Sequence, residues 1–573
     1  MDQTLIAQAH ALLQRNQLDA AFERLMPALD EDQALPLSLK LLLRLALQTG
    51  RMEVAVRAMR RAIALLPQDA EVHALAAAGA KIVGNGEGLE RSARRALQLD
   101  AAQPLATALL VERLGERLDF SEALKVADAY LSHAPRDWGV RLARANIQLF
   151  SGDAAAAAED ADTAARESSS MQARQTALSS LLYMDAVAAE PALARHVALA
   201  SQIEPWALPP SPRQDRGNGR PLRIGLLSAD LRMHPVGLLL EPLLRAHDRD
   251  RAGLFCYHDG APDPQTERLQ AACPQWRDVR GQPDGAVARQ MHEDGIDVLV
   301  DLAGHTAGSR TRLLASRVAQ LQVGYLGYLF DTGFESNDGV VGDHWTLPAD
   351  TRSARNPLRM GGSFLCFATP VDAPPVAARR SGVPTFASFN HLAKLSPATL
   401  QLWARVLAAV PDSRLLLCAL GLADAGVRHK LGERLAAQGI DPSRVELRPP
   451  VLDTPAFLRM YDEVDIALDP LPFNGGMTTL NALWQGVPVI TLPGERMASR
   501  TGASILSAIG MESCIASSEH DYVAIAAQLA SESRLLIDFR ASVRDRLAAS
   551  SLMDAQAFAD RFCRLLEDAC TVR

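Results

Sequence analysis

The chain has 573 residues, of which 48% are hydrophobic and 22% charged, which is enough apolar material for about three globular domains. Its formal net charge of −8 argues against a general affinity for nucleic acid or anionic membranes. The seven cysteines include no Cys-x-x-Cys pair, no apolar run is long enough to span a membrane, and the first residues do not resemble a signal peptide. We therefore expect a cytoplasmic protein without a disulfide framework, zinc knuckle or membrane anchor.

Residues 1–204 are predicted to form helical repeats. Ala, Leu, Arg, Glu and Gln dominate this part, and its apolar residues recur at helical spacing. Segments 50–67, 84–100 and 118–135 resemble one another and a fourth copy begins at Gly152, which gives a period of ~34 residues, typical of tetratricopeptide helix pairs. We expect about four or five pairs to stack into a superhelix whose concave face binds a protein or peptide. The alternative is that the array only supports its neighbour.

A stretch rich in Pro, Gly and charge, residues 205–221, is predicted to be a linker, and residues 222–372 a first α/β domain. Continuous apolar runs predict buried strands, and the segments of helical spacing between them predict helices. The strands are expected at 222–228, 254–258, 298–302 and 322–326, and the helices at 236–244, 265–272 and 284–294. This alternation predicts a doubly wound sheet.

Residues 373–573 are predicted to form a second α/β domain, which follows a Pro-rich linker at 368–384. Ser396 and Pro397 have the residue types that begin a helix, as N-cap and first helical residue. The strands are expected at 385–389, 415–418, 445–447, 464–468 and 487–492, and further helices at 426–438 and 478–485. We again expect a doubly wound sheet.

Three histidines of the first domain stand out. His234 and His305 follow predicted strands, and the carboxyl ends of strands in an open α/β sheet are where ligands bind. His292 ends a predicted helix, where the ordinary role is a cap against the helix dipole. For a single histidine a structural role is the default interpretation.

Residues 464–495 read as a strand, a Pro/Asn/Gly loop, a short helix and a second strand. Its glycines would let the backbone approach a ligand, and Thr478 and Thr479 stand at the helix start, where the dipole favours an anion. Lys394 stands beside another helix start, which is unfavourable for the helix dipole unless an anion occupies the same space. The pattern fits a diphosphate cradle, and an ordinary sheet-to-helix turn with threonine caps is the alternative.

Several motifs together resemble those of the protein O-GlcNAc transferase and SPINDLY family of glycosyltransferases. The segment from Leu468 to Glu495 is similar to the family's donor-binding segment, and Phe389 to Pro397 matches its Phe-x-x-x-x-Lys-x-x-Pro motif. The loop that ends in His234 and Pro235 matches an Asp-x-x-x-His-Pro loop, and residues 291–306 resemble the stretch that follows it. The resemblance covers roughly 222–510, with the repeats upstream as expected.

The resemblance implies a glycosyltransferase B architecture, in which two Rossmann-like domains face each other across a cleft. It also implies an inverting transfer of a sugar, with GlcNAc as first choice, from a nucleotide to Ser or Thr of a protein bound by the repeats. No metal or other cofactor is expected, because Lys394 and helix N–H groups would offset the charge of the leaving diphosphate.

The resemblance assigns roles residue by residue. His234 is the candidate general base and Lys394 the catalytic contact to the diphosphate. The other expected donor-binding residues are Asn390, His391, Phe457, Asn474, Gly475, Gly476, Thr478, Thr479 and Asn481. The residues expected near the acceptor and the sugar are His292, His305, Tyr328, Thr332 and Gly333.

Two departures from the family pattern leave the donor open. The family's Gly-Tyr-Pro-Gly-Thr-Thr-Gly loop reads Gly-Tyr-Leu-Phe-Asp-Thr-Gly at 327–333, and Asn481 stands where an acidic residue holds the ribose. The alternatives are therefore a transferase that uses GDP-fucose or a CMP-nonulosonic acid, as in flagellin modification, or a repeat scaffold whose transferase half has lost activity.

Overall fold

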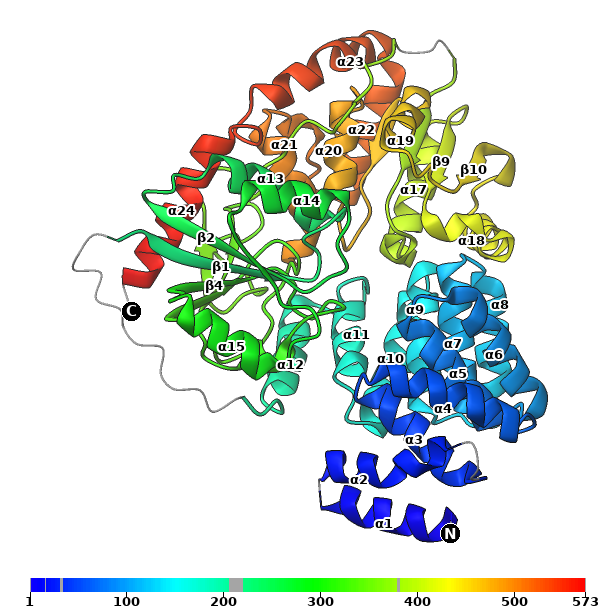
Figure 1. Cartoon of the computed structure of the whole chain (residues 1–573). Coiled ribbons are helices and arrows are strands. Elements are labelled where there is room, and N and C mark those ends of the chain that lie inside the picture. The colour runs from blue at the N-terminus through cyan, green and yellow to red at the C-terminus, as the bar shows by residue number, and fades with distance from the viewer. Residues whose placement is uncertain (1, 16, 31–33, 206–219, 379–381, 572–573) are drawn as a thin grey trace. The chain divides into compact units, whose positions relative to one another are not determined.

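The computed structural model describes residues 2–15, 17–30, 34–205, 220–378 and 382–571 (Figure 1). The chain forms two compact units. The first comprises Met1–Gln148 and Glu159–Ser170, and the second Leu149–Ala158 and Met171–Arg573.

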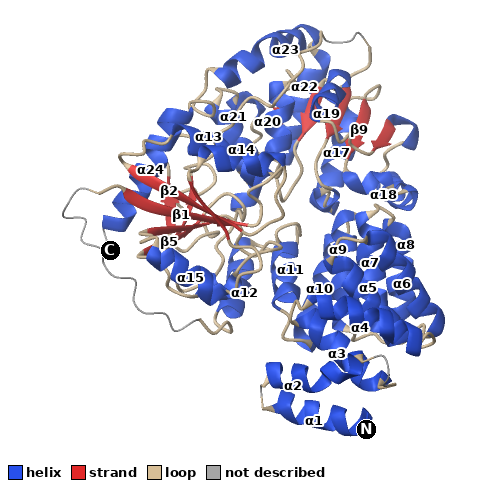
Figure 2. Ribbon diagram, viewed as in Figure 1, coloured by secondary structure: helices blue, strands red, loops and turns tan. Residues whose placement is uncertain are grey.

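The first unit is built from helix pairs, as the repeats predict (Figure 2). Helix α3 packs on α4, α5 on α6 and α7 on α8. Buried alanines such as Ala55, Ala58 and Ala62 of α4 permit close approach of neighbouring helices. The helices are α1 Asp2–Gln14, α2 Leu18–Leu25, α3 Pro36–Gln48, α4 Met52–Leu65, α5 Ala70–Ile82, α6 Gly86–Leu99, α7 Pro104–Glu116, α8 Phe120–Leu131, α9 Trp138–Phe150 and α10 Ala154–Glu167, of which the last two run into the second unit.

One backbone feature recurs with the period of the repeats. Gly50, Gly84, Leu118 and Gly152 have φ values of 70°, 72°, 64° and 84°, the left-handed conformation that ends one helix of a pair before the next begins. Successive members are 34 residues apart in the sequence. Leu118 takes this conformation where the other copies have glycine, so the turn between the helices is kept in the third copy without its glycine.

The predicted repeat domain, 1–204, is too long at its carboxyl end. Helices α11 (Met171–Leu181) and α12 (Ala189–Ala200) belong to the second unit. The Gln175 amide donates to the Thr311 hydroxyl at 2.6 Å, which ties α11 to the first α/β domain. Helical spacing predicts that a helix forms, but not which domain covers its apolar face, so the boundary was misplaced. The predicted linker, 205–221, falls almost entirely outside the described residues.

The first α/β domain contains a seven-stranded, fully parallel sheet in the order β3-β2-β1-β4-β5-β6-β7. Its strands are β1 Leu222–Ser228, β2 Ala252–His258, β3 Gln275–Asp278, β4 Val298–Asp301, β5 Leu321–Gly324, β6 Gly339–Gly342 and β7 Pro357–Arg359, and its helices α13 Pro235–Ala246, α14 Pro264–Ala272, α15 Asp284–Glu293 and α16 Thr311–Ala315. The doubly wound prediction is confirmed. Strands β3, β6 and β7 were missed because they are short and lack long apolar runs.

The second α/β domain contains a five-stranded parallel sheet in the order β10-β9-β8-β11-β12. Its strands are β8 Thr385–Ser388, β9 Arg414–Cys418, β10 Val445–Arg448, β11 Ile466–Leu468 and β12 Val489–Ile490. Its helices are α17 Pro397–Ala409, α18 Ala425–Ala437, α19 Thr454–Arg459, α20 Met477–Trp484, α21 Thr501–Ala508, α22 Glu519–Ser531 and α23 Ser533–Ala548. Ser396 caps α17 by accepting from Thr399 N, as predicted.

The last helix corrects the predicted extent of the second domain, 373–573. Helix α24 (Ala555–Thr571) packs on α13 of the first α/β domain (Figure 1). Arg251 pairs with Glu567 at 2.8 Å, and the Tyr325 and Phe562 rings lie 5.1 Å apart. The apolar face of an amphipathic helix does not specify which element it packs on, so the sequence could not show that α24 packs on the first α/β domain. Over the described residues, no helix is long and apolar enough to cross a membrane.

Candidate functional site

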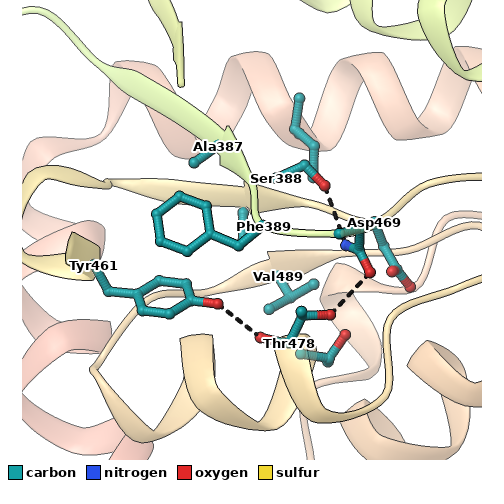
Figure 3. Close-up of a pocket in the computed structure, with 11 residues that line it drawn as sticks. Ala387, Ser388, Phe389, Tyr461, Asp469, Thr478 and Val489 are labelled. Carbon is teal, nitrogen blue, oxygen red and sulfur yellow. Dashed lines mark hydrogen bonds between the residues drawn. The ribbon is translucent and has the colours of Figure 1, made fainter. Parts of the chain in front are cut away.

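A pocket lies at the carboxyl ends of β8 and β11, where the order of the second sheet reverses (Figure 3). The chain leaves β8 toward β9 and β10 and then returns to β11 on the other side of β8. The loops therefore diverge and leave a crevice at the strand ends. The pocket is lined by Ala387, Ser388, Phe389, Asn390, Tyr461, Ala467, Leu468, Asp469, Thr478, Thr479 and Val489.

The start of α20 closes one side of this pocket. The Thr478 hydroxyl donates to Asn390 Oδ1 at 2.9 Å, and the Tyr461 hydroxyl donates to the Thr478 carbonyl at 3.2 Å (Figure 3). Gly476 is the N-cap residue, and no side chain in the described chain caps the helix. The first N–H groups of a helix have no intrahelical acceptor, so they are available to an anionic ligand. Thr478 and Thr479 thus line the pocket, and neither serves as the N-cap.

The backbone at Gly475 lies so close to the side chains of Thr478 and Thr479 that it leaves little room for a side chain. A Cβ placed there would lie 2.5 Å from the Thr478 hydroxyl oxygen and 2.6 Å from that of Thr479. Any other residue type would force these two threonine side chains to move. The Asn474 side chain is buried and donates to Pro470 O at 2.9 Å, so it stabilises the loop and does not point into the pocket.

Lys394 reaches the same loop. Its ammonium donates to Asn474 O at 2.7 Å and lies 4.3 Å from the centroid of the Phe473 ring. Burial lowers the pKa of Lys394, while the carboxylate of Asp469 acts in the opposite direction. The structure therefore brings the predicted lysine and the predicted helix start together, at opposite ends of the short segment 474–478.

Sequence reasoning missed Asp469. This carboxylate is 1% exposed, lines the pocket and accepts from Gly475 N at 2.6 Å and from the Thr491 hydroxyl at 2.7 Å. Burial raises its pKa, and these hydrogen bonds and Lys394 oppose the rise. Its position directly after the apolar strand at 466–468, at the edge where ligands bind, was the available signal.

Three further predicted donor-binding residues lie outside the pocket lining, as do Lys394, Gly475 and Gly476. The Phe457 ring packs near Phe389 and Tyr461, with centroid distances of 5.8 and 6.1 Å, and so supports the aromatic wall from outside. His391 Nδ1 accepts from Ala393 N, its ring packs on Phe150 at 5.1 Å, and burial, together with Lys394, lowers its pKa to about 4. Asn481 is half-buried in α20, beyond the pocket-lining first turn.

On the first sheet, His234 caps α13 after the carboxyl end of β1. Its Nδ1 accepts from Val236 N at 3.3 Å and lies 3.8 Å from Asp230 Oδ2. Burial lowers the pKa of His234, and the Asp230 carboxylate partly offsets this effect. Within the described chain, Nε2 has no hydrogen-bond partner, and the side chain is 40% exposed, so this nitrogen is accessible to a ligand.

His305, Tyr328 and Thr332 do come together, but inside a packed cluster. His305 Nε2 bonds Thr332 O at 2.7 Å, and the Tyr328 hydroxyl bonds His196 Nε2 of α12 at 2.7 Å. Burial lowers the pKa of His196 to about 3 and that of His305 to about 4. Gly333, with φ of 81°, lies against the α12 backbone, where a Cβ would be 2.4 Å from a main-chain carbon. These residues thus anchor α12 and do not present an open surface.

The unusual residues of the 327–333 loop are also structural. Phe330 is 1% exposed and packs on His196 with ring centroids 5.0 Å apart. Asp331 is buried and forms a paired contact with the Arg355 guanidinium at 2.9 and 3.1 Å. The residues that depart from the family pattern therefore pack this loop firmly against its neighbours.

His292 does not join the other histidines. It lies exposed at the carboxyl end of α15. The chain then reaches the amino end of β1, where Asp297 N donates to Arg223 O. His234 and His305 lie at the carboxyl ends of β1 and β4, on the opposite edge of the sheet. A motif match identifies His292 in the sequence, but it does not show at which end of the parallel strands the residue lies. No group of three or more His, Cys, Asp or Glu side chains among the described residues could hold a metal ion.

Comparison with known proteins places the chain among glycosyltransferases. The model of glycosyl transferase family 41 matches residues 194–356 and 380–562, more than half of the chain. Two plant proteins named as probable UDP-N-acetylglucosamine–peptide N-acetylglucosaminyltransferases are similar: SPINDLY of Oryza sativa subsp. japonica, 35% identical over 349 residues, and SEC of Arabidopsis thaliana, 30% identical over 315 residues. These alignments cover 59% and 52% of this chain, but only 38% and 32% of the relatives. The chain thus spans well under half the length of these relatives.

A solved structure is similar over a greater share of its length. It is a mutant of Thermobaculum terrenum O-GlcNAc transferase, 30% identical in sequence, with a TM-score of 0.81. The match covers 88% of this chain and 98% of that one, so the similarity extends from the α/β domains into the helical part.

Proposed function

Because this chain belongs to glycosyltransferase family 41, we propose that it transfers a sugar from a nucleotide donor to a serine or threonine hydroxyl of an acceptor protein. The observation that carries this proposal is that the Lys394 ammonium and the uncapped start of α20 lie at the two ends of segment 474–478, and that the start of α20 lines the crevice between β8 and β11. A cation and free N–H groups at a sheet switch point are suited to a diphosphate. UDP-N-acetylglucosamine is the first candidate donor, since the relatives are named for it.

The proposed reaction is a single inverting displacement. The acceptor oxygen attacks the anomeric carbon, the bond from that carbon to the diphosphate oxygen breaks, and the hydroxyl proton passes to His234 Nε2. Lys394 and the first N–H groups of α20 stabilise the negative charge that develops on the leaving diphosphate. We propose that these groups suffice without a metal ion or cofactor. The helix pairs of the first unit are proposed to bind the acceptor, as stacked repeats usually bind peptides.

Two measurements test this function. A thermal-shift series with UDP, GDP and CMP should show stabilisation by one nucleotide class, which identifies the donor type despite the missing carboxylate at Asn481. Incubation of serine- and threonine-containing acceptor peptides with UDP-GlcNAc, GDP-fucose or a CMP-nonulosonic acid should then add the mass of one sugar. A chain stabilised by none of the nucleotides at any concentration would instead be a scaffold that has lost activity.

A further inference from the structure

The peptide group between Asn474 and Gly475 is held at both ends by charged side chains. Its carbonyl oxygen accepts from the Lys394 ammonium at 2.7 Å, and its N–H donates to Asp469 Oδ1 at 2.6 Å. The negative end of the peptide dipole thus faces a cation and the positive end an anion. Hydrogen bonds to charged groups are stronger than those between neutral groups, so this peptide has one strongly preferred orientation.

Asp469 is itself fixed in place. Its Oδ2 accepts from the Thr491 hydroxyl at 2.7 Å, and its N–H donates to Ile490 O at 3.0 Å in the neighbouring strand. Space around the carboxylate is also limited, because a Cβ at Gly502 would lie 2.3 Å from Oδ2. A carboxylate that is 1% exposed and held from two sides cannot turn away from the loop. The loop therefore takes its orientation from Asp469.

We propose that Asp469 is a positioning residue, which acts through the Asn474–Gly475 peptide to hold the Lys394 ammonium beside the loop that precedes α20, within reach of the leaving diphosphate. This role rests on the proposed function, in which Lys394 contacts the leaving diphosphate. A lysine ammonium has three donors, so the bond to Asn474 O leaves two for phosphate oxygens. Without the carboxylate the peptide could rotate, and the Lys394 anchor would be lost.

The same arrangement gives Asp469 an electrostatic effect on Lys394. Burial lowers the pKa of Lys394, and the negative charge of Asp469 opposes that change. His391 is a further titratable group near Lys394, and burial together with Lys394 lowers its pKa to about 4, so that it is neutral. Removal of the Asp469 charge should therefore lower the pKa of Lys394 further, and the ammonium form would be lost at a lower pH.

Asp469→Asn tests the proposal. The amide oxygen can still accept from Gly475 N, and the amide nitrogen can donate to Thr491, so shape is kept while charge is lost. The pH at which Lys394 titrates, read by mass spectrometry from its reactivity toward an acylating reagent, should fall by about one unit or more. The alkaline limb of the pH–rate profile for sugar transfer should move to lower pH by the same amount. Asp469→Ser, which removes the charge without adding volume, gives the same readouts should the amide variant fail to fold.

Thr491→Val is the matched control, because it removes a hydrogen bond to the same carboxylate but leaves the charge. In this variant Lys394 should titrate as in the wild type. An unchanged Lys394 titration in both neutral variants of Asp469 would overturn the positioning role. The labelling does not depend on activity, so a wild-type chain that transfers no sugar would contradict the proposed function and not this result.

Discussion

The rings of Tyr183 and Phe473 stack with their centroids 5.0 Å apart and 15° between their planes. A second partner of Phe473 is the Lys394 ammonium, 4.3 Å from the same ring centroid. Tyr183 lies between α11 and α12, so a residue of the helical part supports the ring on which the Lys394 ammonium rests. The arrangement links the helices that precede the first sheet to the proposed donor site at the second.

We expect Tyr183→Ala to lower turnover at saturating donor by a few-fold to about tenfold, because a lost aromatic stack is worth roughly 0.5–1.5 kcal/mol. Tyr183→Phe keeps the ring and is the matched control, with turnover close to the wild type. The measurement is kcat for sugar transfer to a peptide. Equal rates for the Ala and Phe variants would mean that the stack has no part in positioning Lys394.

Lys394→Ala should reduce kcat by about 10²–10³, the usual cost of removing one donor that stabilises developing charge. Lys430, an exposed lysine of α18 in the same domain, provides the control variant Lys430→Ala, which should keep the wild-type rate. Single-turnover transfer with donor in excess separates the chemical step from donor binding. A Lys394→Ala chain that retains nearly full rate would remove the leaving-group role.

The pH dependence of transfer should show an acid limb that reports His234. Burial lowers the pKa of His234 from its ordinary value of 6.5. A general base must be unprotonated, so the rate should fall as the pH drops through a pKa below 6.5. His234→Ala should lower kcat by about 10²–10⁴ and abolish this limb. His292→Ala, on the opposite edge of the sheet, should leave the profile unchanged, and a comparable loss there would contradict the placement of these residues.

The buried histidines predict loss of stability in acid. His196 and His305 have lowered pKa values in the folded chain, so below pH 6.5 the unfolded chain binds more protons than the folded one. Each should cost roughly 2 kcal/mol of stability by pH 5. The apparent melting temperature of His196→Gln, which keeps a polar partner for Tyr328 but does not titrate, should fall less between pH 7.5 and 5.0 than that of the wild type. His520→Gln, an exposed control on α22, should behave as the wild type does, and an equal fall in all three chains would argue against the buried histidine.

Much of this fold was predictable because its main elements carry strong local signals. Strand β1 was expected at the residues it occupies, and Ser396 and Pro397 marked the start of α17 correctly. Strand β6 was missed since its four residues, Gly339–Gly342, are too short for a pattern. Its strand character comes from pairing with β5 and β7, which is a tertiary property.

The candidate site was predictable to the level of its loops, but not of every side chain. Lys394 and Thr478 were expected at one ligand site, and the structure brings them to the two ends of segment 474–478, where Lys394 donates to Asn474 O and Thr478 lies in the first turn of α20. For His305 and Tyr328 the sequence identified the right edge of the sheet, but could not show that α12 would cover them. Asp469 was overlooked because a single acidic residue after a strand has no pattern of its own. Its importance comes from the two hydrogen bonds that it accepts, from Gly475 in the following loop and from Thr491 after the next strand.

The return of α24 to the first sheet has a consequence for how the protein is made. During synthesis, β1 and α13 leave the ribosome about 300 residues before the helix that covers α13, a delay of some tens of seconds at common elongation rates. Until the second α/β domain has been translated, the surface of α13 that α24 covers stays exposed. We therefore expect nascent chains arrested before residue 555 to depend on chaperones that shield apolar surfaces, and full-length chains to escape that dependence.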